Sequence, residues 1–297
     1  MPGRCIQWLS LWLLVLCGAG CDRRLEPRPV ETPPVALPRV VSLAPNLTQA
    51  IFSLGAEAQL VGRSDYCTYP AAALAVPSVG RLDLPSYEAI LELQPDWVLV
   101  SGLTPITVVE RLRNLGFRVQ RFTATGIEGI ISVLDILGEQ LERVAAAEHC
   151  IAEIEATVAA YSQRTSLVPF EQRPKVVLLY SLDALYSAGA GTFPDDLIRI
   201  AGGRNIAAEA VSAWPQLNME ALLSANPQVL CLTYDGSEAE ATQLRARLAA
   251  LQKDPIWGQL SAIQNNRVQL LLGDYLSIPS ARSLEVLESL SAALAPR

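Results

Sequence analysis

A fourteen-residue segment that occurs twice is the feature that most constrains the fold of this chain. The segment Tyr87–Val100 (YEAILELQPDWVLV) returns without a gap as Met219–Leu232 (MEALLSANPQVLCL), at a constant offset of 132 positions. Small solenoid units have periods of up to about 50 residues, so this spacing is too long for a solenoid. The repeat therefore predicts two similar lobes, each with a glutamate near the start of a helix that leads into a buried strand.

Apolar strands alternate with amphipathic helices in both halves of the chain. The pattern predicts strands at 39–43, 59–62, 96–101, 117–122, 175–180, 184–187, 229–233 and 268–272. It predicts helices at 47–54 with Asn46 as the N-cap, 86–93, 105–115, 126–137, 195–201, 218–225, 238–251 and 279–294. Helices between apolar strands indicate parallel βαβ units, in which ligands bind beyond the carboxyl ends of the strands.

Residues 139–165 have a different pattern, which predicts one long helix between the lobes. Apolar residues recur there at spacings of three, four or seven, without proline or glycine. The expected fold class is thus α/β, with two Rossmann-like lobes on central parallel sheets, one backbone helix and a ligand cleft between the lobes. The expected boundaries are an N-terminal lobe at 39–138, the helix at 139–165 and a C-terminal lobe at 166–297.

The first residues predict export. Arg4 precedes an apolar run that is shorter than the ~20 residues needed to span a bilayer, and small residues follow it, so residues 1–20 are typical of a signal peptide. Gly18-Ala19-Gly20-Cys21 resembles a bacterial lipobox, which makes Cys21 the expected lipidation site. Five prolines make 21–38 an extended tether. We expect a periplasmic or extracytoplasmic protein, anchored by lipid to the cytoplasmic membrane.

Charge and composition exclude several function classes. A net charge of −7 argues against nucleic-acid binding, which depends on basic contacts to phosphate. The single histidine, His149, lies in the predicted long helix, so neither a three-histidine zinc site nor a loop-borne catalytic triad is available. We expect no enzyme activity and no metal site. An exported compartment permits one disulfide among Cys67, Cys150 and Cys231, without favouring a pairing.

Four segments carry a resemblance to a known family. They are Val40–Thr48, Gly62–Pro70, Tyr87–Val100 and Trp214-Pro215-Gln216. Together with the two lobes and the single helix, they resemble the helical-backbone metal-receptor family, the class III substrate-binding proteins of ABC importers, and are particularly similar to its cobalamin-binding members. The resemblance implies a monomer without a cofactor of its own, which carries a small metal chelate to a permease dimer and its ATPase.

The resemblance also implies two sets of functional residues. Glu88 and Glu220, one on each lobe, match the glutamates that dock on the two permease subunits. Leu82 and Ser101 stand where the cobalamin-binding members have tryptophan. The residues expected to line the ligand cleft are Asn46, Tyr66, Tyr186, Trp214, Asp274 and Tyr275.

These residues favour cobalamin or a related corrinoid as the ligand. A broad apolar macrocycle edged with amides suits aromatic faces and a few orienting polar groups. A ferric siderophore or haem is the alternative within the family. An anionic siderophore would favour several cleft arginines, of which Arg63 and Arg81 are the evident candidates, and haem could use a tyrosine as axial ligand. An exported hydrolase that uses the same cleft is the alternative of another class.

Overall fold

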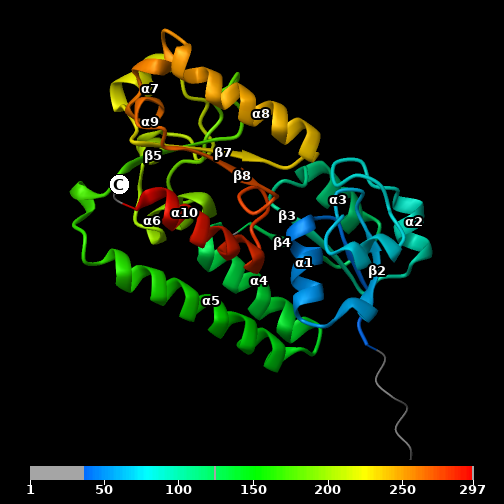
Figure 1. Ribbon diagram of the computed structural model, residues 1–297. Helices are drawn as coiled ribbons and strands as arrows, with labels where there is room; N and C mark the ends of the chain where they lie inside the picture. Colours follow the sequence, from blue (N-terminus) through cyan, green and yellow to red (C-terminus); the bar gives the residue numbers. More distant parts are fainter. Residues whose placement is uncertain (1–36, 124, 296–297) are drawn as a thin grey trace, which may run out of the picture. The chain divides into compact units, whose positions relative to one another are not determined.

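The computed structural model describes residues 37–123 and 125–295 (Figure 1). The expected signal peptide, Cys21 and residues 21–36 of the expected tether lie outside the described residues. Among the helices in the described ranges, none is long and apolar enough to cross a membrane. The strands are β1 (Val40–Ser42), β2 (Leu60–Arg63), β3 (Trp97–Ser101), β4 (Val119–Phe122), β5 (Lys175–Leu179), β6 (Arg204–Asn205), β7 (Val229–Tyr234) and β8 (Val268–Leu272). The helices are α1 (Pro45–Ser53), α2 (Tyr87–Glu92), α3 (Ile106–Asn114), α4 (Gly126–Gln140), α5 (Val144–Thr165), α6 (Phe193–Ile200), α7 (Met219–Ala225), α8 (Glu238–Ala250), α9 (Ser261–Gln264) and α10 (Val286–Leu294).

The two sheets repeat one topology. Each sheet has four parallel strands, in the order β2-β1-β3-β4 in the first lobe and β6-β5-β7-β8 in the second. Counted from the first strand of each lobe, the two orders are the same. The predicted α/β class with two parallel-sheet lobes is confirmed. The strand order reverses beside β1 and β5, which places a ligand crevice at the carboxyl ends of the strands.

The repeated segment forms the same pair of elements in both lobes. It folds as α2 followed by β3 and as α7 followed by β7. Ser86 accepts a hydrogen bond from the Ala89 amide, and Asn218 accepts one from the Ala221 amide, so both helices begin with a side-chain N-cap. The centres of β3 and β7 are fully buried because helices cover both faces of a parallel sheet.

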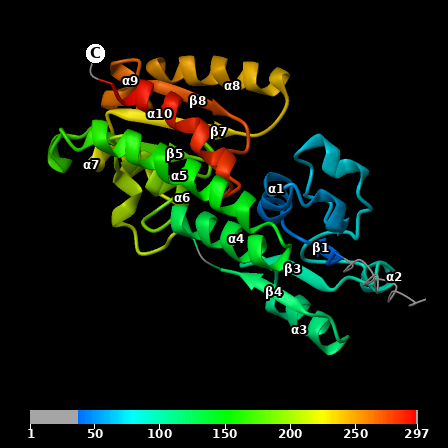
Figure 2. The same cartoon turned by 90° about the horizontal axis from the view of Figure 1, so that it is seen from below.

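The prediction of one helix over 139–165 is wrong at its beginning. The helix α4 continues to Gln140, the chain turns at Glu142 with a φ of 56°, and α5 begins at Val144. Figures 1 and 2 show α5 lying beside α4. A Cβ on Gly138 would lie 2.4 Å from Ala147 Cβ, so the glycine permits this close return. The turn was not predicted because the apolar pattern continues across it, from Leu141, which is buried, to Val144, which is half exposed.

Several smaller expectations also need correction. Residues 184–187 form no strand, because Leu185 has a φ of 51° and only an isolated bridge joins Tyr186 to Gln216. Asn46 is not the N-cap of α1; the helix begins at Pro45, whose ring suits the first helical position. The predicted 279–294 helix is a 3₁₀ segment over 281–285 followed by α10, and β6 was not predicted.

The cysteines in the described ranges are free thiols. They are Cys67, Cys150 and Cys231, the three that the sequence left open for a disulfide. Burial removes Cys67 and Cys231 from contact with solvent, and burial raises the pKa of the Cys231 thiol to about 12. Cys231 therefore acts as a small apolar residue of β7.

Candidate functional site

Most of the predicted ligand residues lie in loops that follow the carboxyl ends of the strands. Tyr66 follows β2, Tyr186 follows β5, and Asp274 and Tyr275 follow β8. Asn46 lies in the first turn of α1, directly after β1. The parallel topology therefore collects residues that are far apart in sequence at one edge of each sheet.

Trp214 is an exposed indole supported from one side. Its ring meets Tyr180 edge-on, with centroids 5.9 Å apart and an interplanar angle of 63°. The Tyr180 hydroxyl donates to the Leu276 carbonyl at 2.5 Å, and burial raises the pKa of Tyr180, so the phenol stays protonated. The Ser187 amide donates to the Pro215 carbonyl at 2.9 Å and ties the Trp214 loop to the segment after β5. Trp214 thus keeps 48% of its surface exposed on a fixed support.

Tyr66 and Tyr186 are the other exposed aromatic residues of the predicted set. Their exposed fractions are 43% and 49%. Tyr66 belongs to the N-terminal lobe, whereas Tyr186 and Trp214 belong to the C-terminal lobe. Within residues 37–123 and 125–295, no ring contact or hydrogen bond joins Tyr66 to the other two. The three rings are therefore free to contact a flat ligand.

Five side chains join the two lobes and form what we call the interlobe cluster. Arg282 pairs with Asp274 at 2.9 Å, and the other carboxylate oxygen of Asp274 accepts a hydrogen bond from Gln49 Nε2 at 3.3 Å. The Arg282 guanidinium lies 3.8 Å from the ring centroid of Tyr69 and 4.6 Å from that of Tyr275. Burial lowers the pKa of Arg282, but Tyr275 and Asp274 outweigh burial and raise it above the ordinary value.

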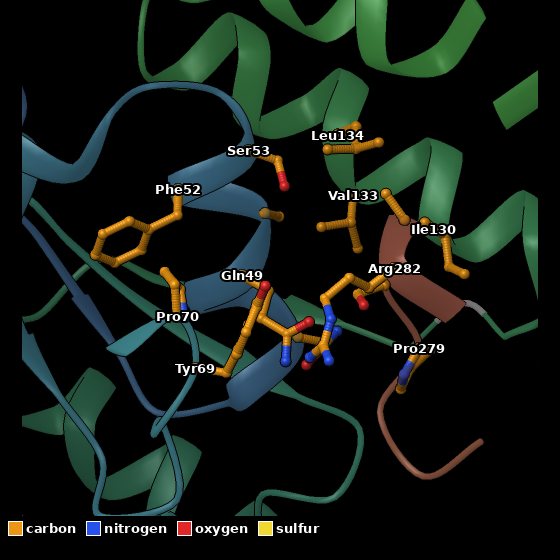
Figure 3. Close-up of a pocket in the computed structure, with 14 residues that line it drawn as sticks. Gln49, Phe52, Ser53, Tyr69, Pro70, Ile130, Val133, Leu134, Pro279 and Arg282 are labelled. Atoms are coloured by element: carbon orange, nitrogen blue, oxygen red, sulfur yellow. The ribbon is translucent and has the colours of Figure 1, made fainter. Parts of the chain in front are cut away.

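A pocket of about 310 Å³ lies beside this cluster (Figure 3). Gln49, Tyr69 and Arg282 form its polar wall, and Val133 and Leu134 of α4 face them from the other side. Among the predicted ligand residues, Asn46 alone lines it. The complete lining is Asn46, Gln49, Ala50, Phe52, Ser53, Tyr69, Pro70, Ile130, Val133, Leu134, Pro279, Ser280, Ala281 and Arg282.

Sequence reasoning missed the residues that support or complete the site. Gln49 is three positions after Asn46 on α1, a spacing that puts both on one helix face and could have revealed it. Tyr69 was evident as a loop aromatic. Tyr180 is the last residue of a predicted strand, where it looks like an aromatic residue of the core. Arg282 lies in the first turn of a predicted helix, where it looks like a solvated charge.

The two predicted docking glutamates occupy the same place in their helices. Glu88 and Glu220 are each the second residue of a short helix, and in each helix the N-cap residue stands two positions before the glutamate. Both glutamate side chains are exposed. A carboxylate in the first turn is favoured by the helix dipole and remains accessible to a partner. The structure therefore presents one equivalent acidic group on each lobe.

The cleft-edge arginines are already occupied. Arg63 donates to the carbonyls of Ala73 and Ser64 at 2.9 and 3.0 Å. Arg81 makes two hydrogen bonds to Asp83, at 2.9 and 2.7 Å. Each guanidinium thus has acceptors within its own lobe, so neither is a free anion-binding group.

The two positions at which the cobalamin-binding members have tryptophan provide no aromatic ring in this chain, and the single histidine lies on α5. Leu82 packs against the core of the N-terminal lobe, and the Ser101 hydroxyl accepts from the Leu103 amide at 3.3 Å. His149 lies on the surface of α5, 3.5 Å from Glu153, as expected from its helical context. Within the described residues, no three His, Cys, Asp or Glu side chains are grouped to hold a metal ion.

The chain is similar to proteins that bind small molecules outside the cytoplasm. Residues 40–275 match the periplasmic binding protein family. The cobalamin-binding protein of Halobacterium salinarum is 33% identical over 239 residues, which are 77% of this chain and 64% of that protein. The vitamin B12-binding protein of Vibrio cholerae is 28% identical over 263 residues, 86% of this chain and 88% of that protein. The crystal structure of a periplasmic haem-binding protein from Pseudomonas aeruginosa aligns with a TM-score of 0.71 and 26% identity, over 87% of this chain and 93% of that one.

Proposed function

The chain belongs to the periplasmic binding protein family, and we propose that it is the substrate-binding protein of an ABC importer, which captures cobalamin or a related corrinoid. The family name implies work outside the cytoplasm. In this proposal the protein is a monomer, held at the cytoplasmic membrane by a lipid on Cys21. It delivers its ligand to a permease dimer that an ATPase drives.

The observation that carries the ligand proposal is the supported indole of Trp214. It lies in the C-terminal lobe near Tyr186, which follows β5, and Tyr66 lies at the corresponding end of β2 in the N-terminal lobe. A corrin ring is a broad, largely apolar surface with amides at its edge. Stacking on fixed aromatic rings buries that surface at low entropic cost, and neutral polar groups such as Asn46 orient the amides. The names of two relatives, which refer to cobalamin and vitamin B12, agree with this choice.

Charge argues against an anionic ferric siderophore. Such a ligand requires cations that are free to pair with carboxylates or catecholates. Arg63 and Arg81 are satisfied within the N-terminal lobe, and Arg282 is paired with Asp274. Haem remains the second candidate, because half-exposed tyrosines could supply an axial oxygen and a structural relative binds haem.

We propose binding without catalysis. A hydrolase of the triad type needs a histidine base within hydrogen-bond reach of a nucleophile. His149 is on the surface of α5, where its neighbour is Glu153. An exported hydrolase is therefore less well supported than a transport receptor.

Titration with cyanocobalamin tests the proposed function. The protein should bind it saturably, and Trp214→Ala should weaken binding by roughly 30-fold, because a buried aromatic anchor contributes about 2 kcal/mol. Phe170→Ala is the matched control, since this ring is 50% exposed and lies in a 3₁₀ segment before β5, away from the ligand edge. Equal binding by the Trp214→Ala variant would remove Trp214 from the site. Tight binding of a ferric chelate without binding of cobalamin or cobinamide would overturn the corrinoid but keep the transport role.

A further inference from the structure

The pocket beside the interlobe cluster has one charged group in its wall. Among the described residues that line it, Arg282 alone carries a charge. Its partner Asp274, 2.9 Å away, is not part of the lining. In Figure 3 the Arg282 side chain reaches toward Gln49 and Tyr69, at the polar wall. A ligand in this pocket would therefore meet the arginine and not the carboxylate.

The ion pair cancels this charge in a partly buried place. The side chains of Arg282 and Asp274 are 22% and 14% exposed, so solvent screens their attraction less than it screens a surface pair. The rings of Tyr69 and Tyr275 cover the guanidinium. The second oxygen of Asp274 is held by Gln49, which fixes the carboxylate beside Arg282. An anion that enters the pocket would have to displace Asp274 from Arg282 or share the guanidinium with it.

Three neutral side chains in the same wall have polar atoms that are available for hydrogen bonds to a ligand. The amide of Asn46, the Oε1 atom of Gln49 and the hydroxyl of Tyr69 make no hydrogen bond within the part of the chain that the structure describes. They offer donors and acceptors of the kind that pair with a primary amide. Opposite them, Ile130, Val133 and Leu134 supply an apolar surface.

We propose that the Asp274–Arg282 ion pair determines the charge selectivity of this interlobe pocket, which accepts a neutral, amide-bearing part of the ligand and rejects anionic chelates. The proposal deepens the proposed function and rests on it for the identity of the natural ligand. Asp274 then acts as the counterion of a ligand-facing arginine and not as a direct ligand contact. Losing the Asp274 carboxylate leaves the partly buried cation with only a longer contact, 3.9 Å from its Nε atom to Glu285, and an anionic ligand compensates for the lost counterion.

The test compares Asp274→Asn with the unmodified protein, with ferric citrate as the anionic probe and cyanocobalamin as the neutral one. Asparagine keeps the shape of the side chain and removes its charge. The variant should bind ferric citrate at least about tenfold more tightly than the unmodified chain, while its affinity for the neutral corrinoid changes by less than about threefold. In the double variant Asp274→Asn/Arg282→Gln the gain should disappear.

Glu171→Gln is the matched control. Glu171 pairs with Arg204 at 2.6 Å; this arginine is 24% exposed and also lies over an aromatic ring, that of Phe170. The control therefore makes the same change in net charge and frees a similar cation at the amino-terminal ends of β5 and β6. An equal gain in Glu171→Gln, or no gain in a folded Asp274→Asn protein, would overturn the proposal.

A second variant covers the case in which Asp274→Asn does not fold. Asn46→Lys adds a cation to the pocket wall while Asp274 and Arg282 both remain in the sequence, and it should also raise the affinity for ferric citrate. A folded Asn46→Lys protein without this gain contradicts the selectivity mechanism. The two claims can fail separately. Absence of cyanocobalamin binding in the unmodified protein would reject the proposed function, whereas a gain of anion binding in Asp274→Asn would still support the charge selectivity.

Discussion

Single residues fix the support of the cleft aromatics, and Tyr180 is the clearest case. It lies directly after β5, its ring meets Trp214, and its hydroxyl reaches the Leu276 carbonyl. Leu276 follows Asp274 and Tyr275 in the same loop. Tyr180 therefore connects the exposed indole to the loop that carries the interlobe cluster. Because burial raises the pKa of Tyr180, this hydroxyl donates its hydrogen bond throughout the neutral pH range.

Removal of that hydroxyl should loosen the connection. We expect Tyr180→Phe to lower the free energy of unfolding by about 1–2 kcal/mol, because the Leu276 carbonyl loses its donor in a buried place. Chemical denaturation measures this change. The control is Tyr234→Phe, whose hydroxyl bonds to Glu240 at an exposed position, where solvent replaces the lost hydrogen bond and the loss of stability should be clearly smaller. Equal losses in the two variants would contradict a special supporting role for Tyr180.

The residues of the site were only partly predictable. Trp214 and Tyr66 lie outside the predicted helices and strands, where a large aromatic residue is a local signal of a binding surface, whereas Tyr186 fell inside the strand wrongly predicted at 184–187. The pairing of Gln49 with Asp274 spans 225 positions, so no local pattern contains it. Arg282 looks like any solvated charge until the packing of the two lobes places it between Tyr69 and Tyr275.

At the scale of elements, the sequence predicts well wherever a pattern repeats. The two copies of the glutamate segment fold as α2-β3 and α7-β7, and each helix has a side-chain N-cap. Buried parallel strands read as apolar runs, so seven of the eight strands were expected close to their observed positions. The exception is β6, whose two residues are too few to produce a pattern.

Elements were misplaced where a turn is hidden inside an apolar pattern. The turn at Glu142 has no glycine at its left-handed residue and no proline, which are the usual signals of a helix end. The close approach of Gly138 to Ala147 explains how α5 returns along α4, but contact between two helices is not visible in a one-dimensional pattern. The strand predicted around Leu185 is absent for a similar reason, because contacts with another loop determine the backbone conformation there.

At the scale of the whole described body, contacts at two places restrain the lobes. The Thr125 hydroxyl donates to the Gly191 carbonyl, and the Ile127 amide donates to Asp196, both at 2.9 Å. The interlobe cluster provides the second set of contacts. Together with the packing of α5 on α4, these contacts oppose a large hinge motion between the lobes. Because the lobes are restrained, the positions of Glu88 and Glu220 relative to each other are also restrained. Each lobe can therefore present its own glutamate to one of two equivalent partner subunits.

Charge reversal at these glutamates tests the docking role. We expect Glu88→Arg or Glu220→Arg to reduce cobalamin uptake by cells about tenfold or more, because like charges at a docking face oppose association. The affinity of the purified protein for its ligand should stay within about twofold, since neither residue lines the interlobe pocket. Glu128→Arg is the control, because this exposed glutamate lies in the first turn of α4, outside the repeated segment. Normal uptake with either reversed glutamate would contradict the docking role.

The central claim is that this chain carries a neutral corrinoid to an importer, and the ligand retained through native purification tests it most directly. The protein is purified from its own cells without denaturant, and mass spectrometry and visible absorption identify what it holds. We predict a cobalamin or another corrinoid at up to one molecule per chain, lost from Trp214→Ala and retained by Phe170→Ala. Retention of a ferric siderophore or haem in place of a corrinoid would contradict the claim.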